Sequence, residues 1–406
     1  MSRVYRCVSA DGHLEFPPDT WSHRVSEQYR DYAPRRIRLA NGGDGFLVEG
    51  QNIYQGGSNL YAGRDPETYD PVGLTWDLPG TGGAEDRLRE MDRDGVDAEV
   101  LFPGVGGRGM WRGIRDDDAY HAIVRAYNDY LGEEYCATDR DRLIGLGVIP
   151  ERGLPQALAE LEHVKALGLK AINLAVFPSG KSYPTPEDDR FWAAALDLDL
   201  PVTIHIQIDR VRGEPAFKYP KEPPAAQRPP DPMPRLYRYG LRGAQAATQL
   251  VMAGVFDRFP RLRIYFAENQ LGWIPLFLEQ MDHNYRRHHF WAERTFGWQK
   301  LERLPSEYVR EHCSWGFFND HYGIRVRNEI GVDHILWGGD FPHVESDWPN
   351  SQRLLREHFE DQGVPAAERD RMVAGNAVDF FKLGDAPRDI GQASPQAAPA
   401  LERVRS

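Results

Sequence analysis

Short, continuously apolar runs recur along this chain and alternate with longer amphipathic stretches. The strands of a parallel sheet covered on both faces have this composition, and helices separate them because parallel strands need long crossover connections. The pattern therefore predicts repeated βαβ units. Eight such runs can be placed, over residues Tyr5–Ala10, Ala98–Phe102, Leu143–Ile149, Ala171–Phe177, Pro201–Ile206, Leu262–Ala267, Cys313–Phe318 and His334–Trp337.

The intervening stretches predict helices. Eight strands with helical crossovers favour an α/β fold of the (β/α)8 TIM-barrel type. The alternative is an open, doubly wound sheet, but a Rossmann fold would place a Gly-rich phosphate loop after the first strand, where this sequence has none. The helices are expected over Glu85–Asp94, Asp118–Ala137, Leu154–Leu167, Asp188–Leu198, Gly243–Phe259, Pro275–His288 and Ser351–Phe359.

Two segments are too long to be ordinary connections. Residues 21–83 follow the first strand, and residues 209–239, which include the run KYPKEPPAAQRPPDPMP, follow the fifth. Both lie on the side of the barrel that carries catalysis, where loops of this length are usually lids or binding loops; the alternative is subunit contact or surface decoration. We expect one barrel domain over residues 1–383, followed by a flexible or subunit-docking tail over residues 384–406.

The charge and the cysteines limit the function classes. A net charge of −12 over 406 residues argues against nucleic acid and anionic membrane as partners, since both attract basic surfaces. Cys7, Cys136 and Cys313 form no CxxC pair, so we interpret them as reduced core residues. The sequence shows no signal-peptide pattern and no stretch of bilayer length. A cytoplasmic protein that acts on a small molecule is expected.

Polar residues stand where several predicted strands end. Asp11 and His13 follow the first strand one residue apart, so their side chains share a face. His205 ends the fifth strand, and Asp340 follows the eighth after two glycines. Barrel enzymes keep their chemistry at these strand ends. Two imidazoles and two carboxylates form a donor set that suits Zn, Mn, Fe or Co.

A single histidine in an apolar strand is more often a core residue than a ligand. The joint pattern is harder to explain structurally, because two buried carboxylates without partners would cost several kcal/mol. A bound cation removes that cost.

Several motifs give the chain a family resemblance. They are Asp11-Gly12-His13, GVDAEV, LGLKAINL, DDRFW with LPVTIH, FPRLRIYFAENQLGWIP, GVDHILWGGDFPHVESDWPNS and GNAVDFF. Through them the chain resembles the amidohydrolase-related family that includes aminocarboxymuconate-semialdehyde and γ-resorcylate decarboxylases, from about Tyr5 to Leu383 outside the long segments. The resemblance implies a mononuclear site with Asp11, His13, His205 and Asp340 as ligands, zinc as the expected ion and no organic cofactor.

One position departs from the family pattern. Where better-known members carry a histidine after the sixth strand, this chain has Glu268. A carboxylate there can act as a base or bind the metal, and the alternative is a structural helix cap or a partner for an arginine. His343, three residues after Asp340, is a candidate proton shuttle or a hydrogen-bonded loop residue.

Five further residues are candidates for substrate binding. Arg108 and Arg112 lie in the Gly-rich segment after the second strand, where a guanidinium can clamp a carboxylate, or they are surface arginines. Trp111, Trp273 and Trp315 stand near strand ends and can wall an aromatic or cyclic substrate, or they are core residues.

Two reactions fit such a site. In nonoxidative decarboxylation, which the resemblance favours, the metal binds the substrate carboxylate and an adjacent oxygen, the ring is protonated, and carbon dioxide leaves. In hydrolysis, the metal activates water, Glu268 or His343 takes its proton, and the hydroxide attacks an amide, a lactone or a similar bond. Asp340 can accept a proton as well as bind the metal. A third hypothesis is a ligand-binding barrel without catalysis. The resemblance also implies a homodimer or a larger homo-oligomer through residues 276–291, LFLEQMDHNYRRHHFW, whose alternative role is packing against the barrel.

Overall fold

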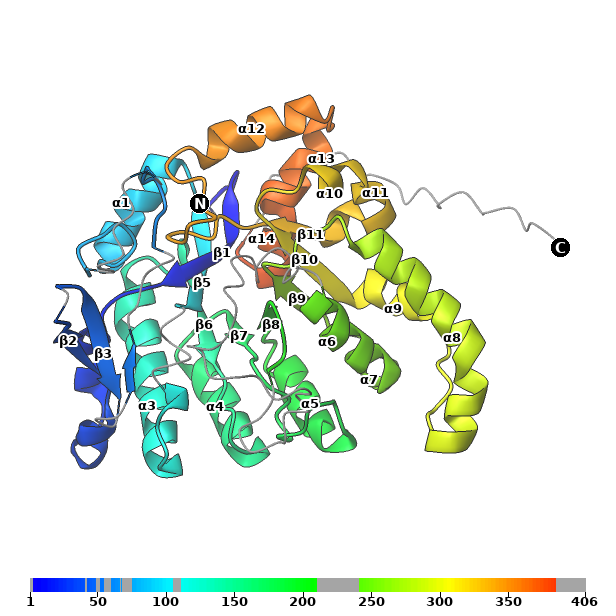
Figure 1. Cartoon of the computed structure of the whole chain (residues 1–406), viewed down its shortest axis with the longest axis horizontal. Coiled ribbons are helices and arrows are strands. Elements are labelled where there is room, and N and C mark those ends of the chain that lie inside the picture. Colours follow the sequence, from blue (N-terminus) through cyan, green and yellow to red (C-terminus); the bar gives the residue numbers. More distant parts are fainter. Residues whose placement is uncertain are drawn as a thin grey trace.

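The computed structural model describes residues 3–40, 42–48, 52–54, 60–65, 67, 75–104, 111–209 and 241–384. Within these residues, eight parallel strands form one sheet that follows the order of the chain, as Figure 1 shows. The strands are β1 (Val8–Leu14), β5 (Ala98–Pro103), β6 (Leu143–Val148), β7 (Ala171–Asn173), β8 (Val202–His205), β9 (Ile264–Ala267), β10 (Cys313–Phe317) and β11 (Ile335–Trp337). All eight predicted strands are present.

The first and last strands meet at a short seam. The amide of His13 donates to the carbonyl of Phe341 at 2.8 Å, and the amide of Asp340 donates to the carbonyl of Asp11 at 2.8 Å. One step earlier, the amide of Gly339 donates to the Ser9 hydroxyl at 2.9 Å. These bonds bring the ends of the sheet together, so the prediction of a (β/α)8 barrel is confirmed.

Helices surround the strands (Figure 1). They are α1 (Ala84–Asp94), α3 (Asp117–Tyr130), α4 (Leu154–Ala166), α5 (Asp189–Asp197), α6 (Leu241–Met252), α7 (Val255–Arg258), α8 (Ile274–Phe296), α9 (Pro305–His312), α10 (His321–Arg325), α11 (Arg327–Ile330), α12 (Ser351–Asp361), α13 (Ala366–Asp370) and α14 (Asn376–Phe381). Short 3-10 or π turns cover Pro18–Thr20, Ser22–Arg24, Glu27–Tyr32, Leu131–Tyr135, Cys136–Thr138, Pro186–Asp188, Val332–His334 and Arg371–Gly375.

Several helix predictions need correction. The single helix expected over Gly243–Phe259 is divided into α6 and α7, because Gly254 adopts a left-handed backbone with a φ of 64° between them. Helix α8 continues eight residues beyond the expected end and stops at Gly297, which is also left-handed. The helix expected over Asp118–Ala137 ends as an α-helix at Tyr130, and π and 3-10 turns continue it over Leu131–Tyr135 and Cys136–Thr138. Helices α9, α10, α11, α13 and α14 were not predicted; the eight residues of α9, PSEYVREH, contain few apolar positions.

Apolar side chains pack on both sides of the barrel wall. Inside, residues of the strands such as Val100, Phe102 and Leu146 form one cluster, to which Phe381 of α14 also belongs. A larger cluster lies between the strands and the helices. Because both faces of the sheet are covered, its strands are continuously apolar.

Strand β1 contains a bulge that matters for the site. Ser9 pairs with Glu99 and Gly12 pairs with Leu101, so β1 has one more residue than β5 over this interval. An extra residue reverses which positions face the barrel interior. Before the bulge Ala10 packs inside the barrel, and after it Asp11 and His13 face the same interior. The predicted strand stopped at Ala10 because the apolar pattern ends there, whereas β1 continues to Leu14.

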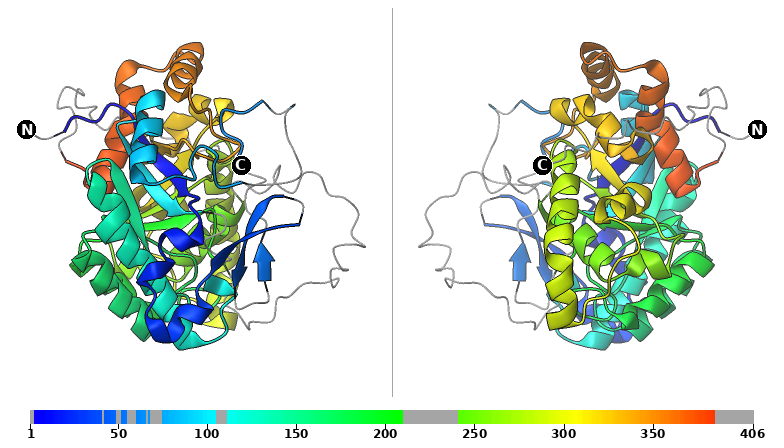
Figure 2. Two further views of the ribbon diagram at one scale, coloured as in Figure 1. Left: turned by 90° about the vertical axis from the view of Figure 1, so that its left-hand side faces the viewer. Right: turned by 90° about the vertical axis from the view of Figure 1, so that its right-hand side faces the viewer.

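The first long segment contains a small antiparallel sheet that the sequence did not predict. It consists of β2 (Arg35–Arg38), β3 (Asp44–Val48) and β4 (Asn52–Tyr54), and it projects from one side of the barrel (Figure 2). Asp44 is buried and pairs with Arg36 at 2.9 Å. The predicted segment 209–239 and the predicted tail lie almost entirely outside the described residues, which omit 210–240 and 385–406.

Two other expectations concern the whole chain. Cys7, Cys136 and Cys313 are free and buried, as predicted. In the described part of the chain, no helix has both the length and the hydropathy that crossing a membrane requires.

Candidate active site

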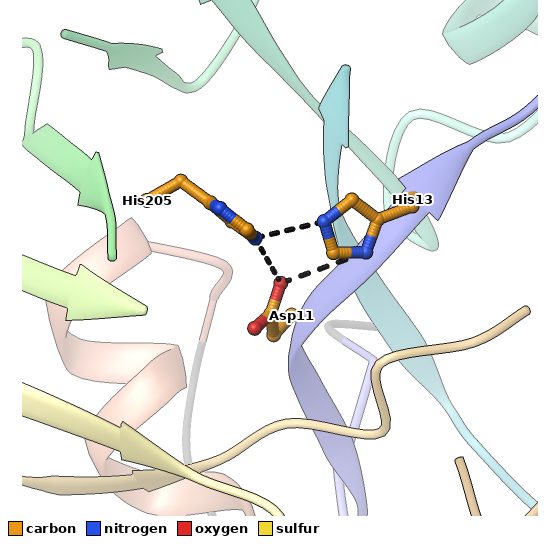
Figure 3. A group of neighbouring side chains, drawn as sticks. All are labelled: Asp11, His13 and His205. Atoms are coloured by element: carbon orange, nitrogen blue, oxygen red, sulfur yellow. Dashed lines mark hydrogen bonds and ion pairs between the residues drawn. The ribbon is translucent and has the colours of Figure 1, made fainter. Parts of the chain in front are cut away.

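Three side chains converge at the carboxyl ends of β1 and β8, as Figure 3 shows. Nε2 of His13 lies 2.8 Å from Nε2 of His205. Oδ1 of Asp11 lies 3.6 Å from the same His205 nitrogen and 4.0 Å from Nδ1 of His13. Asp11 and His13 are 1% exposed and His205 is 9% exposed. Residues 192 positions apart in sequence therefore form one buried polar cluster.

Asp340 joins this cluster from the loop after β11. Its Oδ1 lies 3.2 Å from Nδ1 of His13 and 3.0 Å from Nδ1 of His343. The other nitrogen of His343 lies 3.0 Å from Oε1 of Glu15. Asp340 has a φ of 49°. Residues other than glycine rarely adopt this left-handed backbone conformation, and those that do are concentrated at functional sites.

Glu268 enters the cluster from the end of β9. Its Oε2 lies 3.3 Å from Nε2 of His205, and the residue is 6% exposed. Its φ of 56° turns the chain sharply where the strand ends. The next residue, Asn269, supports this turn, because its side-chain amide donates to the carbonyl of Ala267 at 2.8 Å.

The pKa values of the clustered residues are shifted in different directions. Burial raises the pKa of Asp11 well above its ordinary value, and the nearby carboxylates of Asp340 and Glu268 raise it further. Burial lowers the pKa of His13 to about 4, and the charge on His343 acts in the same direction. Burial also opposes the charge on His343, but Asp340 and Glu15 outweigh it and raise the pKa of His343 to about 10.

For Asp340 the balance is the reverse of that for Asp11. Burial alone would raise its pKa, but the charge of His343 and hydrogen bonds from His13 and His343 outweigh burial and lower the pKa of Asp340. The cluster thus contains an Asp340–His343 ion pair beside a carboxylate and an imidazole whose charged forms are disfavoured.

The donors fit one divalent cation. Both carboxylate oxygens of Asp11 are buried, and in the described structure they have no hydrogen-bond partner. Buried polar atoms normally have partners, and an ion would supply one for Asp11. Two imidazole nitrogens facing each other at 2.8 Å are also the arrangement expected of ligands to a shared ion. Three overlapping donor groups meet here: Asp11, His13 and His205; His13, Asp340 and His343; and Asp11, Glu268 and Asp340.

The tryptophan candidates lie in packing positions. Trp111 and Trp315 are each 1% exposed and belong to the core between strands and helices. Trp315 stacks on Phe266 with ring centroids 4.7 Å apart, and Trp273 packs edge-on against Trp315 at 5.1 Å. Packing thus accounts for their positions, which is the alternative that the sequence left open.

Of the two arginine candidates, the structure describes Arg112 but not Arg108. Arg108 lies outside the described residues, which omit 105–110. Arg112 is held by two carboxylates, since its guanidinium lies 2.6 Å from Glu151 and 2.9 Å from Asp209. These two negative charges already neutralise Arg112, so a substrate carboxylate would have to compete with them.

Sequence reasoning missed several residues that shape the site. Glu15 continues the alternation of Asp11 and His13, a signal that the sequence offered. Phe102 packs its ring 4.9 Å from the ring of His205. Arg87 is buried under the loop after β11, and no local pattern marks it.

Eight parallel strands with buried imidazoles and carboxylates gathered at their carboxyl ends define a barrel enzyme of the metal-dependent type. Within that class the chain belongs to the amidohydrolase family, because residues 10–383 match the model described as Amidohydrolase. The predicted family is thereby confirmed.

Known proteins similar to this chain include decarboxylases. It is 26% identical over 315 residues to γ-resorcylate decarboxylase from Polaromonas sp., across 73% of this chain and 86% of that protein. Its fold is similar to an amidohydrolase from Mycobacterium avium subsp. paratuberculosis, with a TM-score of 0.69, 17% identity and coverage of 94% and 98% of the two chains. It is also similar to 5-carboxyvanillate decarboxylase from Novosphingobium aromaticivorans, complexed with manganese and a nitrobenzoic acid, with a TM-score of 0.61, 16% identity and coverage of 93% and 96%.

Proposed function

We propose that this protein catalyses the nonoxidative decarboxylation of a small aromatic or cyclic carboxylic acid with one divalent metal ion. The observation that carries the proposal is the buried cluster of Asp11, His13, His205 and Asp340, whose facing imidazoles and unpartnered carboxylate fit an ion. Family membership and the relation to γ-resorcylate decarboxylase support this choice of reaction.

The bound ion would act as a Lewis acid toward the substrate carboxylate and an adjacent oxygen. The Asp340–His343 pair holds a proton beside the cluster, with Nδ1 of His343 at 3.0 Å from Oδ1 of Asp340 and Nε2 kept at 3.0 Å from Glu15. We assign this pair as the source of the proton that replaces the carboxyl group. The carbon–carbon bond breaks, its electrons stay on the ring carbon, that carbon takes the proton, and carbon dioxide leaves.

The proposed ion is manganese rather than the zinc expected from sequence. Carboxylate, carbonyl and water oxygens suit Mn²⁺, and this site offers several carboxylates together with the oxygens of an acidic substrate. The similar 5-carboxyvanillate decarboxylase is complexed with manganese. Apo-protein reconstituted with Mn²⁺ should show a higher kcat/KM than apo-protein reconstituted with Zn²⁺, and the opposite order would reject manganese.

Metal analysis and a decarboxylation assay test the proposal together. About one ion per chain is expected in the wild type and should be lost in His13→Ala and in Asp340→Asn. The control His321→Ala, at an exposed position, should keep the ion. Benzoic acids with a neighbouring hydroxyl group should release carbon dioxide only with the loaded protein. A wild type that binds no ion after reconstitution, or that cleaves lactones or amides but releases no carbon dioxide, would refute the proposal.

We also propose that two copies of the chain associate through the end of α8. Exposed aromatic side chains gather there, namely Phe290 (52% exposed), Trp291 (41%), Phe296 (63%) and Trp298 (49%). Exposed apolar patches of this kind mark interaction surfaces. The same stretch carries Arg286, Arg287 and Arg294, which complement a chain of net charge −12. Sedimentation analysis should give a dimer for the wild type and a monomer for Trp291→Glu, and an unchanged dimer in the variant would exclude this surface.

A further inference from the structure

We propose that Glu268 is a direct ligand of the active-site ion, so that the protein supplies five donors instead of the four that the family resemblance implies. The inference rests on the proposed function only in requiring one divalent ion at the cluster. It concerns the one position where this chain replaces the family's histidine by a carboxylate.

The distances place Glu268 among the ligands. Two donors that each lie about 2.1 Å from a shared ion are at most about 4.2 Å apart. Nε2 of His205 lies 3.3 Å from Oε2 of Glu268, 3.6 Å from Oδ1 of Asp11 and 2.8 Å from Nε2 of His13. Glu268 therefore lies at a distance from His205 between those of His13 and Asp11, two of the expected ligands.

Three carboxylates gather where the ion is proposed to bind. Donor atoms of Asp11, Glu268 and Asp340 all lie within 4.8 Å of one another, and all three residues are buried. Carboxylate charges at this separation repel one another. A divalent ion among the three carboxylates would offset this repulsion.

The backbone aims Glu268 into the cluster at a cost. A φ of 56° is unfavourable for a residue with a side chain. The turn is nonetheless fixed, because the amides of Asn269 and Gln270 both donate to the carbonyl of Gly316, at 3.2 Å and 3.0 Å. Backbone strain that the surroundings hold in place is characteristic of functional positions.

A helix-capping role does not account for this residue. Helix α8 begins at Ile274 with Trp273 at its N-cap, and no side chain caps it.

Coordination also has a chemical consequence. A carboxylate bound to the ion is a weaker base than a free one, so Glu268 would not be the residue that activates water. Three carboxylates and two imidazoles form a harder donor set than two of each, which favours Mn²⁺ over Zn²⁺.

A matched pair of neutral variants tests the inference. Glu268→Gln and Glu15→Gln each remove one carboxylate charge next to a histidine of the site. Glu268 is buried and Glu15 is partly buried, but Glu15 contacts His343 and belongs to none of the donor groups. The dissociation constant for Mn²⁺ is measured by competition with a fluorescent chelator. Loss of an outer partner typically weakens metal binding by about 10–100-fold. We expect Glu268→Gln to weaken binding by at least about ten-fold more than Glu15→Gln. Equal effects would overturn the inference.

A crystal structure of the Mn²⁺-loaded wild type gives an answer that does not depend on the folding of any variant. Anomalous scattering locates the ion, and an oxygen of Glu268 within about 2.3 Å of it supports coordination. A separation long enough to hold a water molecule between them would overturn it while leaving the proposed function intact. A wild type that binds no Mn²⁺ in either experiment would overturn both proposals.

Discussion

Replacing Arg87 by methionine should destabilise the protein by removing one partner of a buried ion pair. Nε of Arg87 lies 2.7 Å from Oε2 of Glu99, and Nη2 donates to the carbonyl of Phe341 at 3.0 Å. That carbonyl also accepts the amide of His13 at 2.8 Å. Arg87 therefore connects α1 and β5 to the seam at which β1 meets the loop of Asp340.

The magnitude follows from burial. Arg87 is 1% exposed and Glu99 is 3% exposed. Methionine fills much of the aliphatic volume of arginine, so the main loss is the charge and its hydrogen bonds. Removing one partner of such a pair leaves the other charge buried and alone, at a cost of about 3–5 kcal/mol. Urea unfolding of wild type and Arg87→Met measures this difference.

A double variant separates charge from packing. Adding Glu99→Gln to Arg87→Met removes the isolated carboxylate, so stability should recover to within about 2 kcal/mol of the wild type. Additive losses, or a single variant that costs less than about 1 kcal/mol, would refute the reasoning.

The pH dependence gives a second check. Burial raises the pKa of Glu99, while Arg87 lowers it, so removal of Arg87 raises the pKa of Glu99 further. A carboxyl group whose pKa is higher in the folded state than in the unfolded state destabilises the folded state at a pH above the unfolded pKa and has no effect below it. The deficit of Arg87→Met should therefore shrink as the pH falls through the folded pKa of Glu99 toward the unfolded value of about 4.3. A deficit that does not change with pH would contradict this account.

Three further outcomes are expected. Gly12→Ala should lower the free energy of unfolding by about 1–3 kcal/mol, because the added Cβ would lie 2.3 Å from Oε1 of Glu99. Gly83→Ser adds atoms in open space at an N-cap and should leave the free energy of unfolding unchanged within about 0.5 kcal/mol. Urea unfolding compares the two variants, and equal losses of stability would contradict the packing argument. Trp111→Phe should lower the urea midpoint and leave KM unchanged, and a raised KM at unaltered stability would place Trp111 at the substrate. Asn269→Ala should weaken Mn²⁺ binding by about 10-fold, measured by chelator competition, because it frees the turn that orients Glu268; unchanged affinity would show that this turn does not need the side chain.

The convergence of Asp11, His13, His205 and Asp340 could be predicted from sequence. Each residue follows an apolar strand, and the carboxyl ends of barrel strands meet at one face. The bulge in β1 could not be predicted, because the extra residue is defined only relative to the pairing with β5, which the sequence of β1 does not show. It is the bulge that turns Asp11 inward together with Ala10.

Pairs between distant residues were also beyond sequence reasoning. Arg112 looks available for a substrate in its Gly-rich segment, yet its partners Glu151 and Asp209 lie 39 and 97 positions away. Arg87 looks in the sequence like an ordinary polar residue of α1. In the structure it is buried and donates to the carbonyl of Phe341, 254 positions away. A single sequence contains no information on which opposite charges the fold will bring together.

The seam between the first and last strands links the ion to the fold itself. Asp11 and His13 lie on one side of this seam and Asp340 lies on the other, so an ion bound by all three would stabilise the closed barrel. Each ten-fold excess of ion over its dissociation constant would then add about 1.4 kcal/mol to the closed form. Chelation should accelerate hydrogen exchange at the amides of His13 and Asp340 before it affects the opposite wall. In cells poor in the ion, the protein would lose part of the stability of its closed barrel along with its chemistry.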